Sequence, residues 1–168
     1  GASVVSRLSP AKDAIVYDIG AGTGSVSVEL AMHALYGTVY AVERTKEGCD
    51  LIAQNARKFG LDNIDIINAS AADVIEKLPA ADSVFIGGSG GELEKIMDIV
   101  LKKNPGVHIV ITAVTLETLN DSVRLMEDKK VDVIDIVQIA VTQIKKRGRY
   151  HMLAANNPVF IIEGRGNG

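Results

Sequence analysis

The run Asp18-Ile19-Gly20-Ala21-Gly22-Thr23-Gly24 constrains the fold of this chain more than any other segment. Apolar residues 14–17 precede it, and residues 25–35 follow it with apolar side chains at helical spacing. This order predicts a buried strand, a glycine turn and the start of a helix. Glycines allow positive φ angles and close approach of the backbone to a ligand, and a helix N-terminus offers free N–H groups. We therefore predict that a nucleotide-like ligand binds above the carboxyl edge of a parallel sheet.

Composition narrows the class of protein. With 168 residues, 47% of them hydrophobic, the chain is large enough for one domain with a sizeable core, and we expect residues 1–168 to form it. No apolar run approaches the roughly 18 residues of a membrane span, and no secretory signal is visible, so a cytoplasmic enzyme fits best. Cys49 is the single cysteine, which excludes an intrachain disulfide and a cysteine-based metal site. A net charge of −3 and 4% aromatic residues argue against a general nucleic-acid binder.

Strand-like and helix-like segments alternate along most of the chain. The expected strands are residues 14–19, 38–42, 64–67, 83–86 and 107–113, and the expected helices are residues 25–35, 46–59, 72–77, 92–103 and 116–128. Residues 131–144 and 159–163 are expected as two further strands, with residues 145–157 connecting them and no helix between. This order predicts an α/β domain with a seven-stranded, mostly parallel sheet, a C-terminal antiparallel hairpin and helices on both faces.

The residues around the glycine turn bear on the type of cofactor. A dinucleotide site requires G-x-G-x-x-G, and here Ser25 stands where the third glycine belongs, although a glycine pattern alone is weak evidence. Asp18 at the end of the first expected strand and Glu43 at the end of the second resemble the pattern of class I S-adenosylmethionine-dependent methyltransferases. The resemblance implies that Glu43 binds both ribose hydroxyls and that Asp18 acts indirectly near the ammonium group. The alternatives are a turn without a ligand and an ordinary solvated acid at position 43.

The same resemblance implies a larger set of cofactor-binding residues. They are Asp18, Gly20, Ala21, Gly22, Thr23, Gly24, Glu43, Arg44, Ser70, Ala71 and Gly87. Members of the family often carry Gly-Asp-Ala after the third strand, with the aspartate addressing the adenine amino group. This chain has Ala69-Ser70-Ala71 instead, so Ser70 would bind adenine more weakly. No acidic metal ligands follow the fourth expected strand, and we predict no metal.

Three separated motifs carry a narrower resemblance: DIGAGTGSVS at residues 18–27, IGGSGGEL at residues 86–93 and ITAVTLET at residues 111–118. Together they resemble the decarboxylating precorrin-6Y methyltransferase family of cobalamin biosynthesis, in its C-terminal methylase and decarboxylase domain. The resemblance implies methylation of the meso carbon at position 15 of a corrinoid macrocycle and loss of carbon dioxide from the ring C acetate. It also implies a homo-oligomer, with the hairpin end as a candidate interface. Family members usually carry an upstream segment with a threonine that contacts the cofactor. We expect this chain to begin inside or after that segment, as in a domain excised from a fusion with a second methylase.

A flat polycarboxylate substrate needs a wide cleft with hydrogen-bond donors. The predicted substrate-binding residues are Gly88, Ser89, Gly90, Gly91, Thr112, Thr115, Arg147 and Tyr150. Backbone N–H groups of a glycine-rich turn before a helix suit a carboxylate, and the basic run at residues 145–151 could clamp acetate and propionate groups. His151 is a candidate proton donor. The alternatives are a plain turn, a solvated hairpin loop and a passive surface histidine.

Other functions share the first glycine motif. A transfer-RNA methyltransferase predicts a basic surface, and a small-molecule O- or N-methyltransferase remains an alternative. A non-catalytic S-adenosylmethionine-binding module is the alternative from another class, and it predicts tight cofactor binding without turnover.

Overall fold

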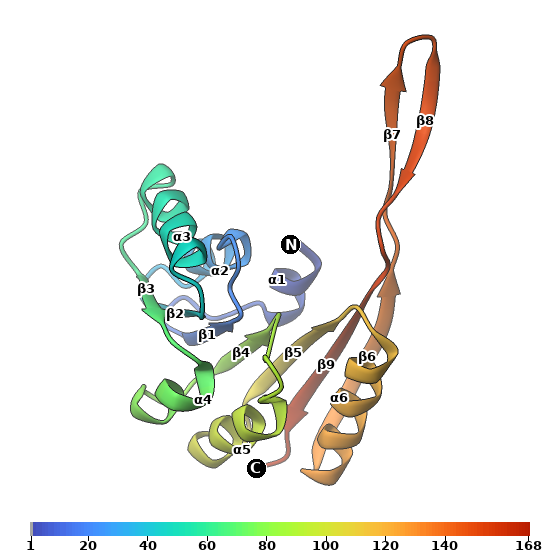
Figure 1. The fold of residues 1–168 in the computed structure, drawn as a ribbon. Helices are drawn as coiled ribbons and strands as arrows, with labels where there is room; N and C mark the ends of the chain where they lie inside the picture. Colours follow the sequence, from blue (N-terminus) through green and yellow to red (C-terminus); the bar gives the residue numbers. More distant parts are fainter. Residues whose placement is uncertain (1) are drawn as a thin grey trace.

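The computed structural model describes residues 2–168, in which strands and helices alternate as far as the last helix (Figure 1). The helices are α1 (Ala2–Leu8), α2 (Ser25–His33), α3 (Lys46–Lys58), α4 (Ala71–Val74), the 3-10 helix η1 (Ile75–Lys77), α5 (Leu93–Lys103) and α6 (Leu116–Asp128). The strands are β1 (Ile15–Ile19), β2 (Thr38–Glu43), β3 (Ile64–Asn68), β4 (Ser83–Ile86), β5 (His108–Ala113), β6 (Val131–Ile139), β7 (Thr142–Arg147), β8 (Tyr150–Ala155) and β9 (Val159–Gly166). Among the described residues, no helix is long and apolar enough to cross a membrane.

The main sheet has seven strands in the order β3-β2-β1-β4-β5-β9-β6. Strands β1 to β5 pair in parallel, and β9 runs antiparallel between β5 and β6, which confirms the predicted sheet. Ile19 of β1 lies opposite Val42 of β2 and Ile86 of β4. This register places the residues that follow these three strands at one edge of the sheet.

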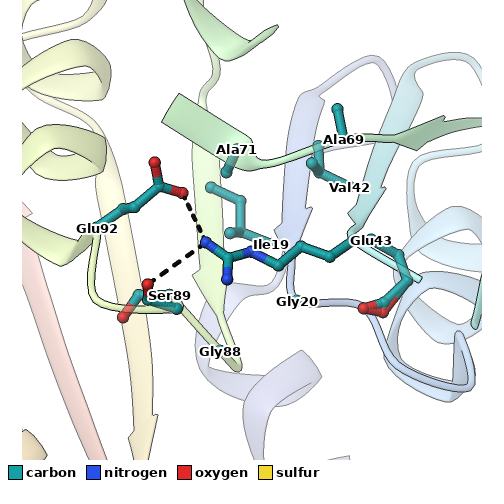
Figure 2. Close-up of a pocket in the computed structure, with 11 residues that line it drawn as sticks. Ile19, Gly20, Val42, Glu43, Ala69, Ala71, Gly88, Ser89 and Glu92 are labelled. Atoms are coloured by element: carbon teal, nitrogen blue, oxygen red, sulfur yellow. Dashed lines mark hydrogen bonds and ion pairs between the residues drawn. The ribbon is translucent and has the colours of Figure 1, made fainter. Parts of the chain in front are cut away.

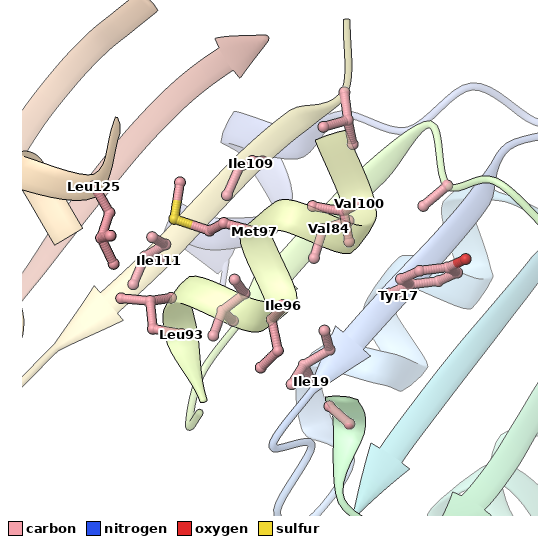
Figure 3. Packing of buried hydrophobic residues seen from close by; sticks show 14 of the residues in the cluster. Tyr17, Ile19, Val84, Leu93, Ile96, Met97, Val100, Ile109, Ile111 and Leu125 are labelled. Carbon is pink, nitrogen blue, oxygen red and sulfur yellow. The ribbon is translucent and has the colours of Figure 1, made fainter. Parts of the chain in front are cut away.

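Helices cover both faces of the sheet, as predicted. On one face, residues of α5 and α6 belong to one buried cluster with residues of β1, β4 and β5, and Figure 3 shows Met97 and Leu125 against Ile111. On the other face, Val5 of α1 and Leu30 of α2 belong to a second buried cluster. Neighbouring strand residues serve opposite faces because side chains alternate along a strand. Tyr17 belongs to the first cluster and Val16 to the second, and both are fully buried.

Two segments differ from the prediction. The expected strand at residues 131–144 is divided, since β6 ends at Ile139 and β7 starts at Thr142. Residues 145–157, expected as a connection, contain the end of β7 and all of β8, which form a separate two-stranded hairpin that projects from the sheet (Figure 1). Gly148, with φ +59°, supplies the left-handed residue of its tight turn. Helix α1 was not predicted, although Val4, Val5 and Leu8 form one apolar face.

Candidate functional site

Two glycine loops touch at the carboxyl edge of the sheet. The Gly20 N–H donates to the Val42 carbonyl oxygen at 2.9 Å, and the Gly87 N–H donates to the Ile19 carbonyl oxygen at 2.9 Å. Gly20 has φ +71°, and a Cβ atom there would lie 2.6 Å from both N and O of Gly88. Because backbone atoms cannot rotate away, this contact requires glycine at position 20. The loops after β1 and β4 therefore form one structural unit.

A first cavity, cavity 1, of about 230 Å³ opens beside this contact (Figure 2). It is lined by Ile19, Gly20, Val42, Glu43, Arg44, Ala69, Ala71, Gly88, Ser89, Gly90 and Glu92. Of the predicted cofactor residues, Gly20, Glu43, Arg44 and Ala71 line it directly. Ser70 reaches it through hydrogen bonds with Arg44 and Glu92. The structure therefore brings residues from the ends of β1, β2, β3 and β4 around one cavity.

The rest of the first glycine turn shapes the site from outside cavity 1. Gly22 and Gly24 have φ +58° and +81°, and a Cβ on Gly24 would lie 2.8 Å from Cγ1 of Ile52 in α3. The Thr23 carbonyl oxygen accepts a hydrogen bond from the Asn55 side chain at 2.7 Å. Ala21 donates its N–H to the Val42 carbonyl oxygen at 3.3 Å. These predicted residues hold the turn against β2 and α3.

Asp18 is fully buried beneath the turn, so it does not line cavity 1. The Ser27 hydroxyl donates to its Oδ2 atom, whereas Oδ1 has no hydrogen-bond partner among the described residues. The pKa of Asp18 is raised to about 6, chiefly because burial desolvates the carboxylate; the charge of Glu43 adds to the rise, and hydrogen bonds with Ser27 oppose it. An unpartnered buried acceptor next to a glycine turn suits a ligand with a cationic or N–H group, contacted directly or through water.

Glu43 is held at the end of β2 by the first turn of α3. A Cβ atom on Gly48 would lie 2.6 Å from Cγ of Glu43 and 2.8 Å from its Oε2 atom. Thr45 caps this helix, and its Oγ1 atom accepts a hydrogen bond from the Gly48 N–H at 3.0 Å. Gly48 is thus a supporting residue that sequence reasoning missed. A glycine inside a helical pattern, close behind a strand-end acid, was the available signal.

A second cavity, cavity 2, of about 320 Å³ lies over the ends of β4 and β5. It is lined by Ile86, Gly87, Gly88, Ser89, Gly90, Gly91, Leu93, Ile111, Thr112, Ala113, Val114 and Thr118. Gly88, Ser89 and Gly90 also line cavity 1, so the loop at residues 88–90 is a shared wall. Gly87, predicted at the cofactor, lines cavity 2 instead. Val114 is 69% exposed, which gives the mouth of this cavity an apolar rim.

Thr115, predicted to bind substrate, does not line either cavity, whereas Thr118, for which no role was predicted, lines cavity 2. Thr115 was predicted to face the cleft, but it is the N-cap of α6, and its Oγ1 atom accepts a hydrogen bond from the Thr118 N–H at 3.1 Å. Thr118 lines cavity 2 in its place. The T-x-x-T spacing at the helix start was the signal for this arrangement.

Cavities of this kind at the edge of a parallel sheet are compatible with many ligands, so comparison with known proteins decides the family. A model described as the precorrin methyltransferase domain matches residues 1–164. The chain belongs to the precorrin methyltransferase family. The resemblance that the three sequence motifs indicated is thereby confirmed.

Individual relatives agree with this assignment. A Pyrobaculum calidifontis protein named "probable cobalt-precorrin-6B C(15)-methyltransferase (decarboxylating)" is 38% identical over 160 residues, which cover 94% of this chain and 82% of the relative. The Salmonella typhimurium cobalt-precorrin-6B C(15)-methyltransferase (decarboxylating) is 34% identical over 162 residues, covering 96% of this chain and 83% of the relative. The crystal structure of precorrin-6y C5,15-methyltransferase from Geobacter metallireducens matches with a TM-score of 0.90 and 37% identity, covering 98% of this chain and 86% of that one.

The basic segment of this precorrin methyltransferase family member lies away from both cavities. Arg147, Tyr150 and His151 were predicted at the cleft, but they are exposed on the β7–β8 hairpin, and neither cavity is lined by any of them. In Figure 1 the tip of that hairpin points away from the sheet. The expectation assumed a connection folded over the sheet edge, whereas strand pairing extends the segment outward. Among the residues that line the two cavities, Arg44 is the basic one.

Proposed function

We propose that this chain is a decarboxylating methyltransferase that uses S-adenosylmethionine to methylate C15 of a cobalt-precorrin macrocycle and releases carbon dioxide from its ring C acetate. One observation carries the proposal: two cavities at one sheet edge share the wall at residues 88–90 in a member of the precorrin methyltransferase family. A methyl donor and an acceptor must meet, and adjoining cavities with a thin glycine wall suit that requirement.

The residues of cavity 1 fit S-adenosylmethionine. Glu43 offers two carboxylate oxygens to hydroxyl donors, and the missing side chain at Gly88, where a Cβ atom would meet only Cα of Gly20 at 3.9 Å, leaves backbone open to a close ligand. The unpartnered Oδ1 atom of Asp18 supplies an acceptor beneath the turn. When bound, S-adenosylmethionine supplies an electrophilic methyl group.

The residues of cavity 2 fit a large, flat polycarboxylate. Backbone N–H groups of the glycine loop precede α5, where a helix N-terminus favours a carboxylate. Val114, which lines this cavity, is 69% exposed, and an apolar rim suits the body of a macrocycle. Ile86, Leu93 and Ile111 form an apolar floor that helps to exclude water. The chain contributes mainly binding and alignment, since the conjugated macrocycle can accept the electron pair left by carbon dioxide.

Calorimetry and product analysis test this function. Wild-type protein should bind S-adenosylhomocysteine, and Glu43→Ala should weaken binding by at least about tenfold because two hydroxyl hydrogen bonds to a charged group are lost. Glu47→Ala, which removes an exposed acid one turn away in α3, is the matched control and should bind as wild type does. With cobalt-precorrin-6B, mass spectrometry should detect a product that has gained one methyl group and lost one carbon dioxide.

Other outcomes would select other functions. Tight S-adenosylhomocysteine binding without turnover of the corrinoid would favour a non-catalytic cofactor-binding module. Binding of NADH in place of S-adenosylhomocysteine would refute the proposal.

The hairpin gives the proposed enzyme a surface for self-association. Ile144 of β7 and Leu153 of β8 are 66% and 73% exposed and lie opposite each other on one face of the hairpin. Exposed apolar clusters of this kind mark interaction surfaces, and we propose that they join copies of this chain into a homo-oligomer. Light scattering should give a smaller mass for Ile144→Ser/Leu153→Ser than for wild type. An unchanged mass would place the interface elsewhere.

A further inference from the structure

Arg44 lies across cavity 1 and joins three segments of the chain. Its Nη2 atom donates to Oε1 of Glu92 at 3.1 Å, to Oγ of Ser70 at 3.2 Å and to the Gly90 carbonyl oxygen at 3.4 Å. The Ser70 hydroxyl donates to the same Glu92 oxygen. We call Arg44, Ser70, Glu92 and the Gly90 carbonyl group the Arg44 bridge. It connects the end of β2, the start of α4 and the loop before α5, and Figure 2 shows Glu92 across the cavity from Glu43.

Gly90 makes this contact possible. Its φ is +57°, and a Cβ atom at this position would overlap the Arg44 guanidinium group. The guanidinium therefore packs against the bare backbone of the loop. A side chain at position 90 would displace either Arg44 or the loop, so the conformation of the loop tip and the position of Arg44 depend on each other.

The loop that the bridge holds is the wall between the two cavities. Its first residue, Gly87, is anchored to β1 by the hydrogen bond to the Ile19 carbonyl oxygen. Its tip, at Gly90, is connected by the Arg44 bridge to the residues that follow β2 and β3. Any movement of that tip changes both cavities, because Gly88, Ser89 and Gly90 line both.

The electrostatics of the bridge favour an ionised pair that contributes little to global stability. The hydrogen bond from Ser70, and then the hydrogen bond and charge of Arg44, lower the pKa of Glu92 below its ordinary value. The Arg44 side chain is 51% exposed and that of Glu92 20% exposed. A partly exposed ion pair adds little to the stability of a fold. Its central position in the site, rather than its energy, indicates its role.

We propose that Arg44 and Glu92 are positioning residues: the bridge holds the loop at residues 87–91, so that binding in cavity 1 and binding in cavity 2 strengthen each other. This inference rests on the proposed function, which assigns the methyl donor to cavity 1 and the corrinoid to cavity 2. Coupling between two sites is reciprocal, so it can be measured from either ligand.

Hydrogen exchange of the ligand-free protein tests the structural half of the proposal. Glu92→Gln keeps the size and hydrogen-bonding oxygen of the side chain but removes its charge. We expect amide exchange at residues 87–92 to become about three- to fivefold faster. The charge exchange Arg44→Glu/Glu92→Arg should move the rate back toward wild type. Arg124→Gln, which breaks two exposed ion pairs on α6, with Asp121 and with Asp128, is the matched control and should leave amide exchange in the loop unchanged.

Calorimetry tests the coupling. For wild type, saturating S-adenosylhomocysteine should tighten binding of dicyanocobyrinic acid, a stable corrinoid polycarboxylate, by at least about fivefold. Glu92→Gln should reduce this coupling factor to below about twofold. In steady-state kinetics, the fold decrease in kcat of this variant should be larger than the fold increase in its KM for S-adenosylmethionine. If Glu92→Gln keeps both the wild-type coupling and the wild-type exchange rates, the bridge is not a positioning device, although the proposed function stands. If neither ligand binds to wild type, the proposed function and this inference fall together.

Discussion

The substitution Gly20→Ala places a methyl group at the contact between the two glycine loops. Gly20 has φ +71°, a region that costs an alanine about 1–2 kcal/mol. The new Cβ would also lie 2.6 Å from N and O of Gly88, and forcing atoms into a packed contact adds about 1–3 kcal/mol. We therefore expect the free energy of unfolding to fall by about 2–5 kcal/mol.

Gly60→Ala separates the two contributions. Gly60 follows α3 with φ +64°, and a Cβ atom there would have no atom within 4 Å. This variant should lose only the conformational contribution, about 1–2 kcal/mol. Gly22→Ala, with φ +58° and a nearest atom 4.0 Å away, should resemble Gly60→Ala in stability.

Urea unfolding followed by circular dichroism measures the stabilities, and calorimetry with S-adenosylhomocysteine measures binding. Gly20→Ala should bind S-adenosylhomocysteine at least about tenfold more weakly, because relief of the clash must move Gly88, which lines cavity 1. A tenfold loss of affinity corresponds to about 1.4 kcal/mol of binding free energy. Gly60→Ala should bind as wild type does. Equal destabilisation of Gly20→Ala and Gly60→Ala, or unchanged binding by Gly20→Ala, would refute the argument that the two loops form one unit.

Three further predictions concern the side chains of Asp18, Arg7 and His151. Burial raises the pKa of Asp18 from 3.8 to about 6, so ionisation of this carboxyl group opposes folding, and its contribution to stability falls as the pH rises from about 4 to 6. In urea unfolding, the free energy of unfolding of Asp18→Asn should therefore gain up to about 3 kcal/mol relative to wild type between pH 4 and 7. Parallel pH profiles of the two proteins would contradict this prediction. Arg7→Met should cost about 1–3 kcal/mol in thermal unfolding, because Arg7 pairs with Asp135 at 2.8 Å and Glu163 at 3.2 Å, and an effect no larger than that of the exposed Arg124→Met would count against it. His151→Ala should leave kcat/KM within about twofold of wild type; a larger loss would mean that a hairpin from another copy of the chain reaches the cavity.

Local signals in the sequence determined most of the sheet and the placement of the two glycine loops. Continuous apolar runs identified β1, β4 and β5, and glycines indicated the turns that follow β1 and β4 at the sheet edge. The carboxyl ends of parallel strands meet at one edge. For that reason Gly20, Glu43 and Gly88 could be predicted to lie near one another, although they are far apart along the chain.

The sequence was less informative about which side chains face the cleft, because this depends on residues that are distant along the chain. The T-x-x-T pattern at α6 allows either threonine to face the cleft, and only the direction of the helix decides that Thr118 does. The basic segment around His151 was expected at the cleft, but pairing of β7 with β8 carries it outward from the sheet.

The sequence by itself indicated the family, the succession of strands and helices along the chain, and the two glycine loops, because these features depend on residues that are close together or on motifs. Only the tertiary structure decided that Arg44, Ser70 and Glu92 form one bridge and that Gly48 makes room for Glu43. The physical reason is how far apart along the chain the interacting residues lie. A local pattern specifies backbone conformation over a few residues, whereas contacts between loops depend on how helices and strands pack across the whole sheet.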